Sequence, residues 1–302
     1  MLGDQNTDIV DAFRKFFKSN SILAKLILIN FSVFVLIYIV SLFAWLFVVE
    51  NGNNQTGLSI LGQWLAVPSS IDRLLLKPWT IFTYMFVHEG LLHLLFNMMV
   101  LYFGGTVFLQ YLSQKQLLWT YLAGGLSGAV VFIVSFNVFP VFSQTIGLSV
   151  AIGASASVLA IVVGISTYVP HYKVNLLLIG PVKLKYLAIA YIILDFFSIM
   201  GNNPGGHLAH LGGALWGFAY VSMLKNNIDI FGFSNRSGSF RMKTSHRAKP
   251  GGRPLNDDEY NRNRVAEQKE IDRILDQIAQ SGYNTLTSRD KELLFRTSNK
   301  KK

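Results

Sequence analysis

The sequence has no cysteine and little charge for its length. Without cysteine the chain can form neither a disulfide nor a thiolate metal site. Charged residues make up 15% of its 302 residues, against about 25% in an ordinary soluble domain. They are also unevenly spread, because none lies between Glu89 and Lys115 or between Lys115 and Lys173. These gaps exclude an ordinary soluble domain and indicate a membrane protein.

Six apolar stretches of about 20 residues predict membrane spans. They cover residues 26–49, 91–112, 117–139, 153–169, 184–200 and 209–224, and the fourth is short and rich in small residues. The first is too long for a signal-peptide core and is interpreted as retained. The predicted fold is therefore an all-α polytopic membrane protein, a bundle of six transmembrane helices in a lipid bilayer.

Composition divides the chain into four predicted parts. Residues 1–21 suit a cytoplasmic interfacial helix, or else a plain juxtamembrane linker, and residues 22–224 hold the six spans. Residues 225–256 predict a basic flexible linker, and residues 257–302 a cytoplasmic helical hairpin of unknown partner or a weakly folded tail. The net charge of +10 lies mainly in this C-terminal part. Because it follows six spans, it is better explained by membrane orientation than by nucleic acid, and no nucleic-acid partner is predicted.

Positive charge also predicts the orientation of the spans. Lys and Arg flank the N-terminus of the first span, the loop around 173–185 and the start of the C-terminal tail, whereas loops 139–152 and 201–206 carry none. The positive-inside rule therefore predicts that both termini face the cytoplasm. In this orientation His88, Ser155, His207 and His210 all enter the membrane from the outer side, at similar depth. Polar side chains in spans are costly, so this coincidence favours one shared site.

The histidine pair in "VHEGLLHLLFNMM" resembles a zinc motif only superficially. His88 and His93 are five residues apart, which leaves their rings about 140° apart on a regular helix, whereas zinc-binding pairs are four apart. No metal and no cofactor are therefore predicted. His93 and Asn97 are four apart and share one helix face, so they can point an imidazole and a carboxamide at one place.

The sixth span predicts a close approach to the fourth. His210, Gly213 and Gly217 lie on one face, and small residues let helices pack closely in lipid. Such packing would bring Ser155 near His210, the minimum for a serine nucleophile, with His93 and Asn97 placed to stabilise an oxyanion. The residues alone leave open a serine or histidine that merely packs, a bis-histidine haem protein and a transporter.

Three motifs on the expected spans resemble the rhomboid intramembrane serine proteases: "HEGLLHLLFNM", "GASAS" and "HLAHLGGALWG". The resemblance covers roughly residues 60–224. It implies that Ser155 is the nucleophile, that His210 is the general base and that His93 and Asn97 stabilise the oxyanion. His88, Gly153, Gly213 and Gly217 match further motif positions.

The chain departs from the family pattern at several positions. Ala156 stands where Gly is usual beside the nucleophile. Thr80 follows Trp79 where Arg is common, which leaves that Arg's structural role unfilled, and residues 106–109 lack the carboxylate often found there. The family works as a Ser–His dyad, so Asp195 is expected to have a structural or substrate-gate role rather than to orient His210. Ser157 is expected to be a packing residue.

The implied activity is that of an intramembrane serine endopeptidase. Its partners would be transmembrane protein substrates, cut in or near their membrane segments. A non-catalytic rhomboid-like binder is the alternative. The site would open to the outer side of a bacterial inner membrane, with the glycine-containing loop 201–206 as a lid.

Overall fold

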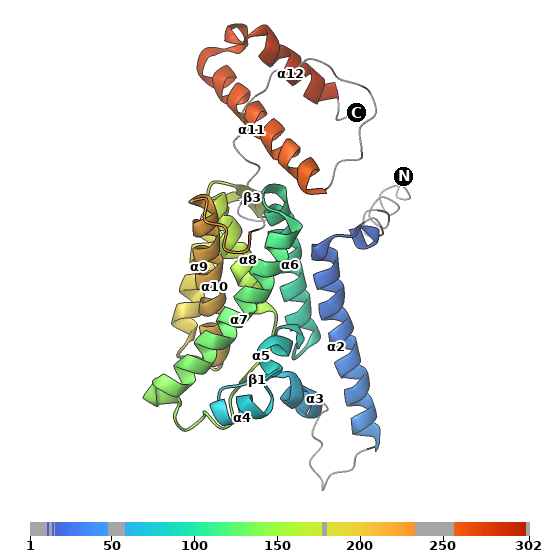
Figure 1. Ribbon diagram of the computed structural model, residues 1–302, viewed down its shortest axis with the longest axis vertical. Helices are drawn as coiled ribbons and strands as arrows, with labels where there is room; N and C mark the ends of the chain where they lie inside the picture. Colours follow the sequence, from blue (N-terminus) through green and yellow to red (C-terminus); the bar gives the residue numbers. More distant parts are fainter. Residues whose placement is uncertain are drawn as a thin grey trace. The chain divides into compact units, whose positions relative to one another are not determined.

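The structure is a computed structural model that describes residues 11, 14, 16–47, 58–176, 180–232 and 257–299. The chain divides into two compact units, residues 1–108 with 114–236 and residues 109–113 with 237–302. Most of the described residues are helical (Figure 1). The larger part of the predicted N-terminal segment (1–21) and of the predicted linker (225–256) lies outside the described residues.

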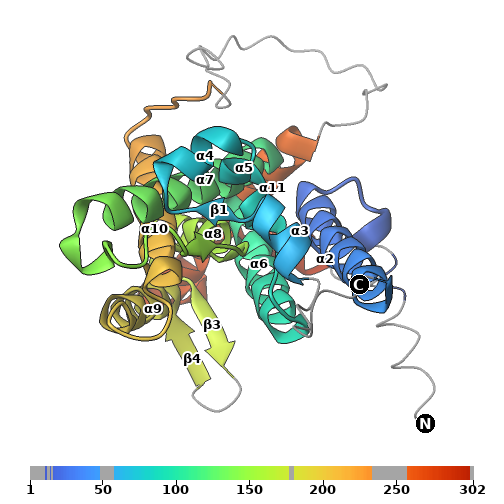
Figure 2. The ribbon, with the colours of Figure 1, turned by 90° about the horizontal axis from the view of Figure 1, so that it is seen from below.

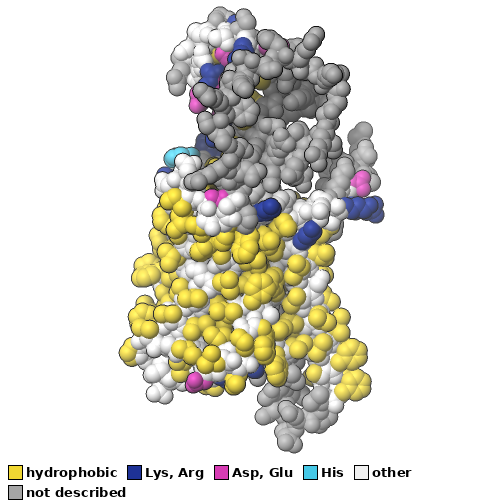
Figure 3. Space-filling view, viewed as in Figure 1, with side chains coloured by type: hydrophobic (Ala, Val, Ile, Leu, Met, Phe, Trp, Pro, Cys, Tyr) yellow, Lys and Arg dark blue, Asp and Glu magenta, His cyan; other side chains and the backbone are white. Residues whose placement is uncertain are grey.

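Apolar helices follow the predicted spans in the first unit. They are α2 (Ile22–Phe47), α6 (Leu91–Tyr111), α7 (Gln114–Val138), α8 (Ser155–Tyr168), α9 (Leu184–Ser198) and α10 (Pro204–Lys225). Among the described helices, α2, α6 and α7 are long and apolar enough to cross a membrane. Figure 3 shows a broad band of hydrophobic side chains over this unit. Such a surface belongs in lipid, so the chain is an integral membrane protein.

Helix α8 lies at the centre of this unit, in contact with α7, α9 and α10 (Figure 2). Ten of its 14 residues are buried, as expected for a helix that is apolar on all sides. The close packing predicted between the fourth and sixth spans is present. A Cβ added to Gly213 or Gly217 of α10 would collide with the carbonyl oxygen of Ala156 or Ala160 of α8.

Short elements of the first loop support the chain that leads into α8. They are α3 (Leu58–Leu65), β1 (Val67–Pro68), α4 (Ile71–Leu76), α5 (Thr80–Thr83) and η1 (Tyr84–Phe86). Strand β1 pairs antiparallel with β2 (Val150–Ala151), which follows η2 (Pro140–Phe142). The Ser69 hydroxyl donates to the Ile146 carbonyl at 2.6 Å. The non-helical backbone before α8 therefore finds its hydrogen-bond partners within the protein, as it must at membrane depth.

Two further contacts fix this approach to α8. The Arg73 guanidinium of α4 donates to the Gly147 carbonyl, and the Gly153 N–H donates to the Tyr84 carbonyl at 2.9 Å. Arg73 thus supplies a guanidinium link between the first loop and the segment before Ser155.

The prediction of an all-α chain is wrong in detail. Besides β1 and β2, the described residues include a hairpin of β3 (Lys173–Leu176) and β4 (Gly180–Lys183), which joins α8 to α9. The hairpin begins and ends at Lys173 and Lys183, which pair in register. Gly180, with φ at +85°, follows its turn, and Pro181 disfavours helix. The chain is thus mostly helical with two small sheets.

The second unit contains α11 (Asp257–Ser281), η3 (Tyr283–Thr285) and α12 (Ser288–Asn299). The Ile274 side chain of α11 is fully buried, and Arg273 forms an ion pair with Asp290 at 2.7 Å. The Thr287 hydroxyl accepts from the Asp290 N–H at 3.3 Å, which caps α12. Hydrogen bonding to Thr287, followed by that to Arg273, holds the pKa of the Asp290 carboxyl below its ordinary value.

Candidate active site

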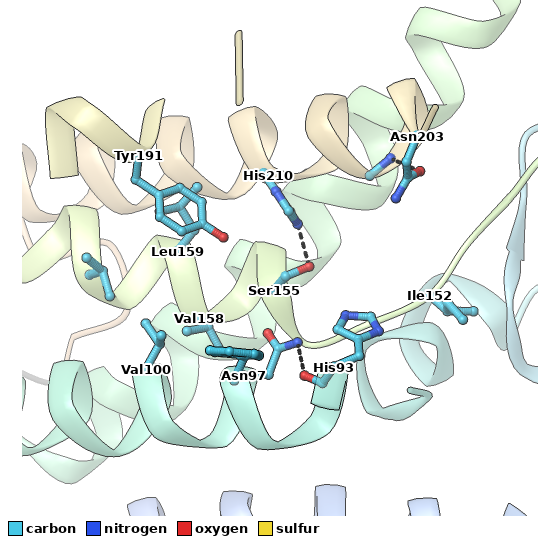
Figure 4. Close-up of a pocket in the computed structure, with 13 residues that line it drawn as sticks. His93, Asn97, Val100, Ile152, Ser155, Val158, Leu159, Tyr191, Asn203 and His210 are labelled. Carbon is cyan, nitrogen blue, oxygen red and sulfur yellow. Dashed lines mark hydrogen bonds between the residues drawn. The ribbon is translucent and has the colours of Figure 1, made fainter. Parts of the chain in front are cut away.

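Ser155 and His210 face each other across the contact between α8 and α10. The distance from Ser155 Oγ to His210 Nε2 is 2.6 Å, a hydrogen bond (Figure 4). Both side chains are half-buried and line a cavity of about 350 Å³ between α6, α8, α9 and α10. A hydroxyl bonded to an imidazole nitrogen is the arrangement in which a histidine can accept a serine proton.

Local backbone geometry places Ser155 at the first residue of α8. Gly153 has φ at +120°, a conformation that side chains disfavour, and Ala154 precedes the helix. Helix α8 therefore begins abruptly after strand β2, with the serine at its N-terminus. The first N–H groups of a helix lack partners within it, and this end carries partial positive charge, so an anion beside Ser155 would be favoured.

Two glycines of α10 determine where His210 lies relative to α8. Gly213 and Gly217 lie three and seven residues after His210 and have no side chain to separate α10 from the α8 backbone. Because the two helices are in contact at Gly213 and Gly217, His210 lies beside Ser155, the first residue of α8. The predicted pairing of Ser155 with His210 rests on this contact.

Asp195 of α9 is the principal correction to the sequence analysis of the site. One oxygen, Oδ1, lies 2.8 Å from His210 Nδ1 and 2.7 Å from His207 Nδ1. The carboxylate is 4% exposed, and its other oxygen, Oδ2, is buried without a hydrogen-bond partner. The expectation that Asp195 would not orient His210 is therefore wrong in its geometry, because α9 packs against α10 with Asp195 turned toward both imidazoles.

Asp195, His207 and His210 are also residue types that can bind a metal ion. Ligand atoms of Asp195, His207 and His210 all lie within 4.8 Å of one another, which no other group of His, Cys, Asp or Glu among the described residues achieves. The two N–O distances of 2.7 and 2.8 Å are those of direct hydrogen bonds. Ligands about 2.0–2.1 Å from one tetrahedral zinc ion would lie further apart. The arrangement is that of a carboxylate accepting from two imidazoles.

His93 and Asn97 of α6 line the opposite wall of the cavity (Figure 4). As their spacing predicts, both point into it. The Asn97 amide donates to the His93 carbonyl at 2.9 Å, within its own helix. The His93 ring lies against the open face of Gly153, where an added Cβ would be 3.1 Å from His93 Nε2. The two side chains thus face the Ser155 end of the cavity.

His88 lies behind this wall. It precedes α6 and is fully buried, and its ring packs edge-to-face on the His93 ring at 5.1 Å between centroids. Its Nδ1 lies 3.3 Å from the Phe86 carbonyl oxygen, and Nε2 has no hydrogen-bond partner. His88 is not among the residues that line the cavity. Its ring thus contacts His93 from outside the cavity.

Comparison with known proteins identifies the family. The profile of the rhomboid domain matches residues 76–227, half of the chain and all of the residues that line the cavity. The chain belongs to the rhomboid family. A second profile, a family of unknown function (DUF6576), matches residues 256–300, the region of α11 and α12.

Two curated relatives of this rhomboid are mitochondrial proteins by name. Presenilin-associated rhomboid-like protein A from Danio rerio is 30% identical over 140 residues, 45% of this chain and 35% of the relative. Presenilin-associated rhomboid-like protein from Rattus norvegicus is 28% identical over 159 residues, 50% of this chain and 39% of the relative. The match thus spans less than two fifths of each relative.

The two small residues after the nucleophile position pack away from the cavity in this rhomboid. A Cβ added to Gly128 of α7 would lie 2.6 Å from the Ala156 Cβ, so the Ala156 methyl group occupies the space that Gly128 leaves. Ser157 is fully buried, with its hydroxyl 3.9 Å from Met85 Sδ. As expected, Ser157 is a packing residue, and the extra methyl of Ala156 points toward α7.

Several residues of the site were missed by the sequence analysis. Tyr191 of α9 lines the cavity with its ring centroid 6.2 Å from that of His210. Asn203 caps α10, accepting from the Gly206 N–H at 3.0 Å, and Pro204 begins the helix. The "NNP" sequence is a recognisable helix start. Half of the predicted lid loop 201–206 is therefore helical, and His207 lies in the first turn of α10.

Proposed function

We propose that this rhomboid is an intramembrane serine endopeptidase in which Ser155 is the nucleophile and His210 the general base. The proposal rests on the 2.6 Å hydrogen bond between Ser155 Oγ and His210 Nε2 at the wall of a cavity. The family match supports the same reading. The location of this hydrogen bond, at a cavity wall and at the N-terminus of α8, favours a catalytic role over a packing role for the two side chains.

The first step forms an acyl-enzyme. Ser155 Oγ attacks the carbonyl carbon of the scissile peptide bond while its proton passes to His210 Nε2. A new O–C bond forms, and the carbonyl π electrons move to the oxygen. When the tetrahedral intermediate collapses, the C–N bond breaks and the proton on His210 Nε2 passes to the leaving amine. Water then adds to the acyl carbon as His210 Nε2 takes its proton, and the C–O bond to Ser155 breaks as that proton returns to Ser155 Oγ.

The oxyanion would be stabilised on the open face of Gly153. The position that a Cβ added to Gly153 would occupy is 3.1 Å from His93 Nε2 and 3.5 Å from Ser155 Oγ. A negatively charged oxygen that forms beside this point, on the carbon bonded to Ser155 Oγ, would lie close to His93 and at the positive end of α8. The Asn97 amide lines the same cavity. Each such donor contributes about 3–4 kcal/mol to transition-state stabilisation in serine hydrolases.

The proposed substrates are transmembrane proteins cut in or near a membrane segment. Six apolar side chains line the cavity: Phe96, Val100, Ile152, Val158, Leu159 and Val162. Such a lining suits an apolar stretch of chain rather than a charged peptide. We further propose that all six helices cross the bilayer, with both termini and the C-terminal hairpin on the cytoplasmic side and the site opening outward. The mitochondrial relatives give no support to the bacterial inner membrane expected from the sequence.

A serine-directed fluorophosphonate probe tests the proposal on the full chain purified in detergent. Wild-type protein is expected to be labelled, Ser155→Ala and His210→Ala to lose labelling by at least about 10²-fold, and Ser157→Ala to keep it. Ser157 is the matched control because it is a serine on the same helix that packs against Met85. Absence of labelling in correctly folded wild-type protein would instead favour a non-catalytic binder of membrane proteins. Unchanged labelling of Ser155→Ala would show that the nucleophile is another serine.

A further inference from the structure

Asp195 is an unusual residue in its surroundings. It is the one Asp or Glu between residues 90 and 228, and it is 4% exposed on an apolar helix. A carboxylate at membrane depth is costly unless it is paired or performs a function. The two imidazoles of α10 are its hydrogen-bond partners, and both approach the same oxygen, Oδ1.

The contact on the His210 side has a chemical consequence. To accept the Ser155 proton on Nε2, neutral His210 must carry its own proton on Nδ1. Its Nδ1 lies 2.8 Å from Asp195 Oδ1, so this tautomer donates to the carboxylate and the other tautomer cannot. The same bond fixes the ring with Nε2 directed at Ser155, 2.6 Å away.

We infer that Asp195 is a positioning residue for His210, so that this rhomboid works with a Ser155–His210–Asp195 triad in place of a dyad. The inference rests on the proposed protease function and deepens it. Asp195 takes no proton during the reaction. It holds the required tautomer and stabilises the imidazolium that forms when the Ser155 proton arrives, as a buried carboxylate does in other serine hydrolases.

Other groups around the two imidazoles complete the electrostatic setting. Facing His210 are Ser155 of α8, Tyr191 of α9 and His93 of α6, besides Asp195. His207, in the first turn of α10, donates to Asp195 from the side away from Ser155, with a ring centroid 5.9 Å from that of His210. Among the residues that the structure describes, Asp195 is the one carboxylate in contact with His210, so removing its charge isolates its effect.

The test compares fluorophosphonate labelling rates of the full chain between about pH 5 and 9. Asp195→Ala and Asp195→Asn are expected to lower the labelling rate at neutral pH by about 10- to 10²-fold, below the roughly 10⁴-fold loss known for a triad aspartate. The low-pH limit of labelling should also move, because His210 loses the carboxylate that its Nδ1 contacts.

His207→Ala is the matched control. It removes the other hydrogen bond on the same Asp195 oxygen but leaves the one to His210. If Asp195 acts directly on His210, His207→Ala should lower the labelling rate less than Asp195→Asn does. Thermal unfolding in detergent, measured for every variant, identifies any that fails to fold, and the Asn and Ala variants at 195 are independent of each other.

The outcomes separate the two proposals. Wild-type labelling rates and an unmoved pH limit in folded Asp195→Asn would overturn the triad while leaving the protease intact. Equal losses in Asp195→Ala and His207→Ala, again with an unmoved pH limit, would overturn it too, because Asp195 would then only fasten α9 to α10. Labelling that persists in Ser155→Ala would overturn the proposed function itself.

Discussion

Gly153 is the residue whose missing side chain matters most to the proposed chemistry. Its φ of +120° lets the chain turn from strand β2 into α8, and its open face is the space in which the oxyanion would form. A side chain would both strain the backbone and lie 3.0 Å from the nearest atom of His93. Two separate physical requirements therefore select glycine at this position.

Gly153→Ala is expected to abolish labelling while leaving a folded protein. The methyl group occupies the oxyanion position, which predicts a loss of about 10²- to 10³-fold, as for removal of an oxyanion donor. The positive φ adds a destabilisation of about 1–3 kcal/mol. Probe-labelling rate and the midpoint of thermal unfolding measure the two effects separately.

Ala156→Gly is the control for that substitution. The Ala156 methyl packs against Gly128 of α7 and not into the cavity, so its loss should change the labelling rate by less than about threefold. The cost should appear in stability, at about 1 kcal/mol for a helix glycine. A large gain in labelling for Ala156→Gly would show that the methyl group does narrow the site.

The sequence predicts the residues that line the site but not the contact between His210 and Asp195. Ser155, His210, His93 and Asn97 could be named because spacing and span direction place them at one depth. Asp195 was misjudged because its direction depends on how α9 rotates against α10, which periodicity on a uniformly apolar helix does not reveal. One available signal was physical: a lone carboxylate in an apolar span requires a partner, and His207 and His210 share a helix face.

At the level of helices, the contact between α8 and α10 holds the two halves of the site together. The contact depends on glycines, because Gly213 and Gly217 let the α10 backbone lie directly on the α8 carbonyls. Glycine is otherwise unfavourable within a helix by about 1 kcal/mol. Close packing of α10 on α8 offsets that cost. The same close packing brings His210 within hydrogen-bond distance of Ser155.

Gly217→Val should separate the helices at this point. The side chain would collide with the Ala160 carbonyl, so α10 must move and carry His210 with it. We expect a loss of stability of about 1–3 kcal/mol or more from overpacking, and a fall in labelling of at least about tenfold as the Ser155–His210 hydrogen bond is lost. Leu215→Val, a change on the same helix at a side chain that is 62% exposed, should affect neither measurement. Wild-type stability and labelling of Gly217→Val would show that the contact is not required.

The order and type of the helices were predictable, whereas some boundaries and all the strands were not. Apolar runs locate α2, α6 and α7 to within a few residues. Helix α10 starts at Pro204, five residues before the predicted Ala209, because glycines 205 and 206 reduced the apolar signal while the Asn203–Pro204 cap was overlooked. The pairing of β1 with β2 joins residues more than 80 positions apart, and no local pattern encodes it.

For the molecule as a whole, the lengths of the helices bear on how they cross the bilayer. Helix α9 has 15 residues, about 22 Å at 1.5 Å per residue, and α8 has 14. A hydrocarbon core is about 30 Å thick. A helix of this length crosses only where flanking chain, neighbouring helices or local thinning of the bilayer supply the difference. The proposed six-span topology requires α9 to do so.

The absence of cysteine allows a direct test of that crossing. Lys173 at the start of β3 and Asn202 between α9 and α10 are both exposed, and α9 is the one helix between them. In intact cells expressing the full chain, a membrane-impermeant maleimide should label Asn202→Cys, because the positive-inside rule puts this uncharged loop outside. Lys173→Cys should be labelled only after the membrane is permeabilised. The cysteine-free wild type gives the background, and retained probe labelling at Ser155 shows that each variant is folded. Labelling of both cysteines from the same side would mean that α9 does not cross, whereas a reversed pattern would invert the orientation while preserving the span.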